Sequence, residues 1–182
     1  KDEKFLNADE HQLAGKVPTK YFALTIGKIG VADYFDDNIY SHDPRTQFMC
    51  WSLMDNGAWD YPANTRGYTP SIVLEYVTPK NELRYAISLE PMEANGNVMD
   101  WKINKANSHS LEYTHRYFLK GKPGAVRFLG FFNTANMGNY NESIALNPSA
   151  PDIIATRKYG RTKYGFGINA EQSITKDAGM FL

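Results

Sequence analysis

The stretch that decides the fold is residues 33–70, DYFDDNIYSHDPRTQFMCWSLMDNGAWDYPANTRGYTP. It lies between two segments, 21–28 and 71–78, in which apolar and polar residues alternate as they do in β-strands. Structureless connections longer than about 12–15 residues are uncommon unless they are functional. We therefore expect the connection of residues 29–70 to have a structure and a role of its own.

The middle of this connection is predicted to be a helix near residues 44–56. Asp43 is a good N-cap, Pro44 suits the first helical position, and Asn56-Gly57 suits the helix exit. The apolar residues between them point in nearly every direction around a helix: Phe48, Met49, Cys50, Trp51, Leu53 and Met54. Because a helix that is apolar on all sides is normally buried, we expect the loop to fold into an interior, where Trp51 packs.

The rest of the chain is predicted to be a series of antiparallel strands. Besides 21–28 and 71–78, the expected strands are 82–90, 109–119, 125–132 and 163–171, and another begins at Met180; residues 1–20 are expected to be a polar loop. The connections alternate between long and short, in the order 29–70, 78–81, 91–108, 120–124, 133–161 and 173–179. An outer-membrane barrel keeps this order, with short turns at one end and long loops at the other.

Composition narrows the range of functions. The chain of 182 residues is ordinary for one domain, and its 20 basic and 20 acidic residues argue against a nucleic-acid partner bound by charge. No segment approaches the roughly 18 consecutive apolar residues of a transmembrane helix. There is no HExxH, CxxC or paired-histidine spacing, so the sequence predicts neither a metal site nor a cofactor.

The polar faces of the expected strands carry ionised side chains of both signs. Five of them are candidates for the lining of a water-filled lumen: Glu75, Arg84, Glu112, Arg116 and Arg127. The alternative is the solvated outer face of an ordinary antiparallel sheet. The helix that is predicted to fold inward favours the first interpretation, in which these side chains line a water-filled lumen. A barrel of about eight strands is filled by its own side chains and could not admit a helical loop, so we expect these strands to be part of a larger barrel.

With the loop and the strands in view, the sequence resembles the carbohydrate-selective porin family (OprB-type) of Gram-negative outer membranes. The resemblance is dense across 27–78 and thinner through the Leu-Glu-Tyr and Gly-Phe-Gly-Ile-Asn-Ala-Glu-Gln segments. The motifs that carry it are Gly27-Lys28, Asp33-Tyr34-Phe35-Asp36-Asp37-Asn38, Tyr40-Ser41-His42-Asp43-Pro44-Arg45-Thr46-Gln47-Phe48, Trp51, Asp55-Asn56-Gly57-Ala58-Trp59-Asp60-Tyr61-Pro62-Ala63 and Thr65-Arg66-Gly67-Tyr68.

The resemblance implies an all-β fold, an antiparallel up-and-down outer-membrane β-barrel of roughly 16 strands. Residues 1–182 would then be a single internal section of about seven strands, and the 29–70 loop would fold inward as a constriction. It also implies a passive channel in the bacterial outer membrane, surrounded by membrane lipid, rather than an enzyme. Sugars would be the permeating solutes, and no cofactor would be needed.

A sugar path needs planar hydrogen-bonding groups beside aromatic rings, because sugars are polar on their hydroxyls and apolar on their C–H faces. The 29–70 loop concentrates such residues, and the candidates for the substrate path are Asp43, Arg45, Asn56, Trp59, Asp60 and Arg66. Other roles stay open, since Asp43 also suits a helix cap. Asp60 and Arg66 also suit an ion pair that holds the loop against the wall.

Two other functions stay open on the sequence alone. A soluble carbohydrate-binding β-sandwich would use the aromatic-rich loop as its binding face. Such a protein would be soluble as a monomer in the absence of detergent. An outer-membrane barrel enzyme would hydrolyse a substrate, although no Ser/His/Asp spacing supports it. The sequence does not set the oligomeric state.

Overall fold

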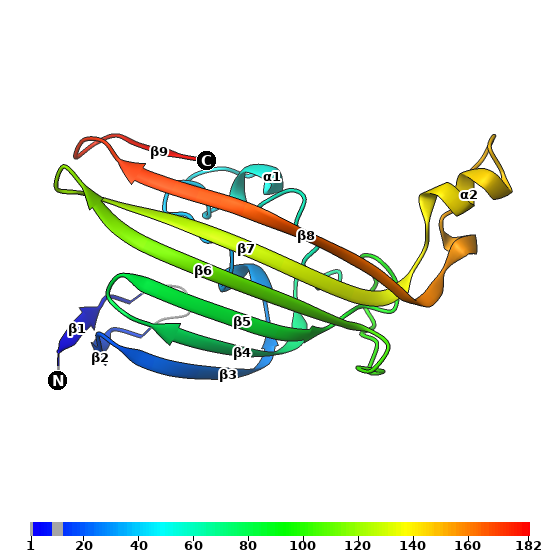
Figure 1. Ribbon diagram of the computed structural model, residues 1–182, viewed down its shortest axis with the longest axis horizontal. Coiled ribbons are helices and arrows are strands. Elements are labelled where there is room, and N and C mark those ends of the chain that lie inside the picture. The colour runs from blue at the N-terminus through cyan, green and yellow to red at the C-terminus, as the bar shows by residue number, and fades with distance from the viewer. Residues whose placement is uncertain (1, 9–12) are drawn as a thin grey trace.

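The computed structural model describes residues 2–8 and 13–182 (Figure 1). Its main feature is a seven-stranded antiparallel sheet in the order β3-β4-β5-β6-β7-β8-β9, in which each strand pairs with its neighbours in sequence. The strands are β3 (Tyr21–Ile29), β4 (Thr69–Val77), β5 (Asn81–Leu89), β6 (Asn107–Leu119), β7 (Lys122–Met137), β8 (Lys158–Ser173) and β9 (Gly179–Phe181). This is the predicted up-and-down arrangement, and the connections alternate between long and short as expected.

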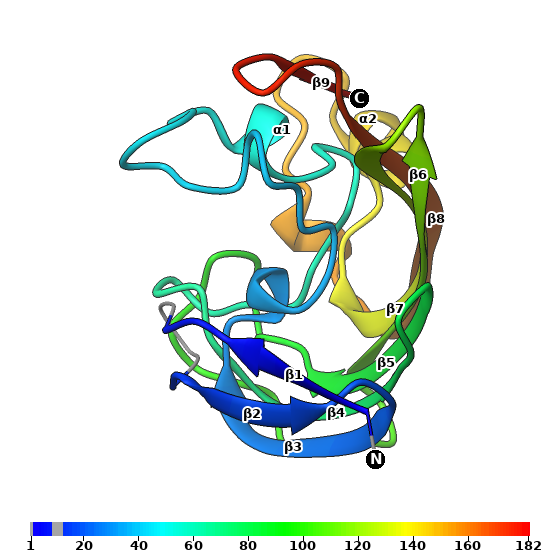
Figure 2. The same ribbon diagram turned by 90° about the vertical axis from the view of Figure 1, so that its left-hand side faces the viewer.

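The sheet curves into a trough, and the loop between β3 and β4 lies on its concave side (Figure 2). The helical elements lie in the long connections and are all short: η1 (Val31–Asp33), α1 (Trp51–Met54), α2 (Tyr140–Leu146) and η2 (Ile154–Thr156). Asn139 caps α2 by accepting a hydrogen bond of 3.0 Å from the Glu142 N–H. Within residues 2–8 and 13–182, none of these helices has the length and apolar character needed to cross a membrane.

In a water-soluble sheet the apolar face is buried and the polar face is exposed, and in this sheet the arrangement is reversed. The convex face is apolar and open, and its exposed side chains include Phe22, Leu24, Ile26, Ile72, Leu83, Leu111, Phe128, Phe132, Phe166 and Ile168. Phe166 is 80 % exposed. The concave face is polar and buried beneath the loop, and its side chains include Ser71, Glu82, Ser88, Ser110, Glu112, Thr114, Arg127, Asn133, Asn169 and Glu171. An exposed apolar surface of this extent marks contact with a membrane or another protein.

A small hydrophobic core joins the loop to the wall of the trough. It consists of Val31, Phe35 and Trp59 from the loop and Val73, Ala86, Leu129 and Phe131 from the concave face. Phe35 is completely buried, and its ring centroid lies 6.1 Å from that of Trp59. The Trp59 ring lies in turn 5.3 Å from that of Tyr61. Burial of these rings provides the main apolar contribution to docking the loop.

The loop's helix is shorter and more exposed than the sequence suggested. Asp43 caps only a single turn, in which its carboxylate accepts a hydrogen bond of 2.8 Å from the Arg45 N–H. Cys50 then adopts an extended conformation (φ −83°, ψ 117°), so that α1 has only four residues. Trp51 is 62 % exposed, and Met54 is the buried residue of α1. The expected burial of Trp51 is therefore wrong.

Two strand expectations also need correction. In the described part of residues 1–20, β1 (Glu3–Leu6) and β2 (Gly15–Pro18) form an antiparallel hairpin instead of a polar loop; residues 1 and 9–12 lie outside the described residues. β7 and β8 are also longer than predicted, because they continue pairing as far as Met137↔Lys158, across a register shift that alternation in the sequence does not reveal.

Candidate functional site

A buried hydrogen-bond network fixes the loop against the concave wall. The Asp36 backbone N–H donates to the Glu112 carboxylate at 2.7 Å. The Asn169 side-chain amide donates to the Asp36 carboxylate at 3.1 Å, and the Asn38 amide donates to Asn169 Oδ1 at 2.9 Å. A fourth bond, of 2.9 Å, runs from the Ile39 N–H to Glu171. Because buried polar groups are costly unless they are paired, this network specifies one position of the loop on the wall.

Asp36 itself is in a conformation that needs such support. Its φ of 60° lies in the left-handed region, which Asp adopts more readily than most residues but still at a cost. Residues in such regions persist only where the surrounding structure fixes them. The contacts from Glu112 and Asn169 therefore also hold the turn at the beginning of the loop.

Ion pairs cover the wall beside this network. Arg84 pairs with Glu75 at 2.9 Å and with Glu82 at 2.5 Å. Arg116 also pairs with Glu82, and Arg127 lies 3.3 Å from Glu171. The five residues predicted to line a lumen, Glu75, Arg84, Glu112, Arg116 and Arg127, thus all lie on the concave face, where alternation in the sequence places them. Each of their charges lies beside a charge or donor that compensates it.

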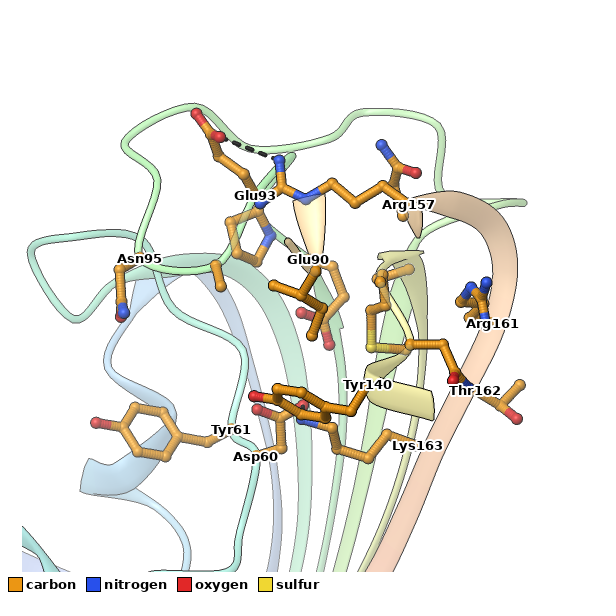
Figure 3. A pocket seen from close by; sticks show the side chains of 18 of the residues that line it. Asp60, Tyr61, Glu90, Glu93, Asn95, Tyr140, Arg157, Arg161, Thr162 and Lys163 are labelled. Carbon is orange, nitrogen blue, oxygen red and sulfur yellow. Dashed lines mark hydrogen bonds and ion pairs between the residues drawn. The ribbon is translucent and has the colours of Figure 1, made fainter. Parts of the chain in front are cut away.

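A cavity of about 760 Å³ opens at the end of the sheet where the long loops lie (Figure 3). Its wall comes from the 29–70 loop, the connection that follows β5, the end of β7 with the start of the α2 segment, and β8. The side chains at its centre include Trp59, Asp60, Tyr61, Glu90, Tyr140, Arg161 and Lys163. Asp60 pairs with Lys163 at 2.8 Å, and Arg161 pairs with Glu142. Aromatic rings and charged or hydrogen-bonding groups therefore surround the same space.

Several polar atoms in this cavity wall are buried without a hydrogen-bond partner in the structure. They are the Trp59 indole N–H, one Glu90 carboxyl oxygen and Nε of Arg161. Burial raises the pKa of Glu90 to about 8; Asp60 raises this pKa further and Lys163 lowers it. Glu90 is therefore mostly a neutral acid at pH 7, with an O–H group to donate. Buried polar groups normally have partners, and atoms as covered as these suit a partner no larger than water.

The structure separates the predicted substrate-path residues into two sets. Trp59 and Asp60 line the cavity, and Asp60 pairs with Lys163. The other candidates, Asp43, Arg45, Asn56 and Arg66, do not line it. Asp43 caps the turn, and the Asn56 side-chain oxygen Oδ1 accepts a hydrogen bond of 3.0 Å from the Ala58 N–H.

Sequence reasoning missed four other cavity residues. Lys163 and Glu90 lie on the polar faces of alternating segments, so the period-2 pattern could have placed them on the concave side. Tyr140 and Arg161 fall in the expected loop of residues 133–161, where the sequence shows no such pattern. The extension of β8 back to Lys158 places Arg161 beside Ala135 on the wall, and the start of α2 brings Tyr140 to the cavity.

Asp55 makes the docking of the loop sensitive to pH. Neither of its buried carboxylate oxygens has a hydrogen-bond partner among residues 2–8 and 13–182, and His42 Nδ1 lies 3.6 Å from Oδ1. Burial raises the pKa of Asp55 to about 6; His42 lowers this pKa, and Asp36, Asp33 and Asp37 raise it. The folded state then binds more protons than the unfolded state between pH ~4 and ~6. The stability of the docked loop should therefore fall as the pH rises through this window.

Asp55→Asn should abolish most of this pH dependence and stabilise the loop above pH ~6 by roughly 2 kcal/mol. Hydrogen exchange of residues 31–56, measured between pH 4 and 8 and corrected for the intrinsic rate, would report the change. Asp177→Asn is the control, because the Asp177 side chain is 78 % exposed. If the exchange rates of wild type and Asp55→Asn depend on pH in the same way, Asp55 is not the group that takes up a proton when the loop docks.

The fold and the site together define a class of protein. A curved up-and-down sheet with an apolar open face outside, and a polar face covered by an inserted loop inside, is the wall of a porin-type β-barrel. The family "Carbohydrate-selective porin, OprB family" matches residues 10–181, and the chain belongs to this family. This confirms the resemblance seen in the sequence. No curated protein sequence matches the chain.

A solved structure is similar to this fold. It is the high-pH structure of Pseudomonas putida OprB, with a TM-score of 0.59 and 19 % sequence identity over 85 % of this chain. The match confirms the antiparallel barrel architecture, and at this identity it shows the fold alone. The chain spans 37 % of the length of that solved chain.

Proposed function

We propose that this chain forms part of the wall and constriction of a water-filled outer-membrane channel through which carbohydrates diffuse passively. Its family is one of carbohydrate-selective porins, which are channels rather than enzymes. The apolar convex face would contact membrane lipid. Of the concave charged residues, Glu75, Arg84 and Arg116 would line the lumen, which the docked 29–70 loop would narrow. Glu112 and Arg127 are buried beneath this loop and would hold it in place. No cofactor is required for diffusion.

The observation that carries the sugar specificity is the cavity at the mouth of the trough. Its partly exposed charged side chains Asp60 and Lys163 suit sugar hydroxyls, and the rings of Tyr61 and Tyr140 suit the C–H faces of sugars. Because the charges on the wall compensate one another, the field favours neither sign of ion, which suits neutral solutes. Of the substrate-path candidates, Trp59 and Asp60 are the two we retain at this site.

The function is tested with the full-length protein that contains this chain, reconstituted in planar bilayers. Sugars that enter the channel should reduce its ion current. Combining Tyr61→Ala with Tyr140→Ala should weaken this block by about 30-fold, since two aromatic contacts of on the order of 1 kcal/mol each sum to about 2 kcal/mol. Tyr164→Ala is the matched control, because Tyr164 is 77 % exposed on the convex face.

Other outcomes would overturn the proposal. A detergent-free soluble monomer would favour a carbohydrate-binding module, and hydrolysis of a substrate would favour a barrel enzyme. Equal current block by sugars in wild type and in the double variant would remove the cavity from the sugar path.

The lipid-facing role of the convex surface predicts the effect of a charge placed there. Phe128 lies near the middle of β7 and is 48 % exposed. Phe128→Arg should destabilise the barrel in liposomes by roughly 2–4 kcal/mol, the cost of an arginine at the bilayer midplane. Urea titration in liposomes measures this, with Phe128→Leu as the control. A cost below 1 kcal/mol would argue that water, not lipid, covers the face.

A further inference from the structure

A second hollow lies on the convex face, outside the trough. Its volume is about 330 Å³, and its lining residues are Ile26, Gly27, Pro70, Ser71, Ile72, Ile87, Ser88, Leu89, Trp101 and Ile103. Eight of these come from the β3–β5 part of the sheet, near the end with the long loops. Trp101 and Ile103 come from the connection between β5 and β6, and they form the remaining wall. We call this hollow the convex groove.

The connection holds Trp101 and Ile103 in place through its own hydrogen bonds. The Asp100 N–H donates to the Glu90 carbonyl at 2.8 Å, and the Lys102 N–H donates to the Asp100 carboxylate at 2.9 Å. The Asn107 amide donates to the Ile103 carbonyl at 2.7 Å. Trp101 is nevertheless 74 % exposed. A well-held segment therefore presents a large aromatic side chain to the surroundings of the convex face.

The groove is apolar inside and has a cation at one end. Its two hydroxyl side chains, Ser71 and Ser88, bond to each other at 2.7 Å and are buried toward the concave side. Lys28 lies directly opposite Pro70 in the β3–β4 register. Its side chain is on the same face as that of Ile26, because the two residues are separated by one period of the strand. Lys28 is exposed and lies toward the long-loop end of the sheet.

We propose that the convex groove binds one acyl chain of a phosphate-bearing lipid of the outer membrane leaflet, with Lys28 beside the phosphate. The groove is continuous with the apolar convex face, so lipid is the medium that reaches it if the chain spans a membrane. In outer-membrane barrels the longer loops are extracellular. Trp is typical of the membrane interface, and a lysine close to the membrane surface attracts anionic headgroups. This inference rests on the proposed function.

Native mass spectrometry of the full-length protein in detergent tests the proposal. The probes are purified lipid A, which carries phosphates and acyl chains, phosphatidylethanolamine, and inorganic phosphate. Wild type should retain one lipid A. The double change W101S and I103S should lower retention by about 10-fold through lost apolar contact. K28Q should lower lipid A retention by about 5-fold, the effect of one lysine near a charged surface, with phosphatidylethanolamine little affected.

Two matched controls separate the groove from the rest of the surface. Phe166→Ser changes an open apolar residue elsewhere on the convex face, and Lys120→Gln changes a lysine in the turn between β6 and β7, at the other end of the sheet. Neither should change the retention of lipid A. The proposal is overturned if the groove variants retain lipid A as wild type does, or if inorganic phosphate at millimolar concentration displaces it. A shift from dimer to monomer in the groove variants, without lipid loss, would assign the groove to a second copy.

Current block by sugars, measured on the same variants, separates this inference from the proposed function. We expect W101S with I103S to lose lipid A while sugar block stays at the wild-type level, since the groove lies outside the trough. If lipid A binds at the groove but sugars never enter the channel, the proposed function fails and the groove assignment stands.

Discussion

Trp59→Ala is expected to destabilise the docked loop by roughly 3–5 kcal/mol, the usual cost of truncating a buried tryptophan to alanine. Trp59 is 4 % exposed and packs against Phe35 and Tyr61 in the core between loop and wall. The loss should appear as faster hydrogen exchange throughout residues 31–64, because the core holds both ends of this segment. β6 and β7 should keep their protection, since their ladder bonds do not depend on this core.

Trp51→Ala provides the matched control, because the same side chain is removed from the same loop at a position that is 62 % exposed. Its effect should stay within about 0.5 kcal/mol, as is usual for surface positions. Trp59→Phe should give an intermediate loss, since it keeps part of the apolar contact. If Trp51→Ala and Trp59→Ala prove equally costly, the core is not what docks the loop.

The strands were predictable because their period-2 alternation is a local property of the sequence. Residues 82–90 alternate except at Ala86, and the observed β5 covers Asn81–Leu89. Alternation also fixed which residues share a face, as with Arg84 and Glu112. It could not say whether the apolar face is the inside or the outside. That decision depended on the long loop between β3 and β4.

The details of the loop were not predictable, because they depend on contacts distant in sequence. The pattern at residues 44–56 fits a helix, but only one turn forms, closed by the bond from the Gln47 N–H to the Asp43 carbonyl. The Gln47 side-chain amide then donates to the Ile39 carbonyl, and Cys50 is extended. Asp60 pairs with Lys163, which is far along the chain, and nothing in the sequence near Asp60 indicates this partner. Glu90 owes its raised pKa to burial that only the assembled cavity creates.

Asn169→Leu is expected to release the first part of the loop from the wall. Its side-chain amide donates to Asp36, and its oxygen accepts from the Asn38 amide. Leucine has nearly the same size, but it leaves the buried groups of Asp36 and Asn38 without these partners. A buried group that loses its partner costs roughly 1–3 kcal/mol, so two such groups should cost about 2–6 kcal/mol. The left-handed conformation of Asp36 would lose support at the same time.

Hydrogen exchange separates this effect from the loss of the core. In Asn169→Leu the amides of residues 34–41 should exchange at least about tenfold faster, since 1.4 kcal/mol corresponds to a factor of ten in an opening equilibrium. Trp59 and its surroundings should keep more protection than in Trp59→Ala. Ile168→Leu, on the convex face of the same strand, is the control for packing changes in β8. If hydrogen exchange at residues 34–41 is unchanged in Asn169→Leu, the apolar core alone positions the loop. The polar network is then a consequence of loop docking and not its cause.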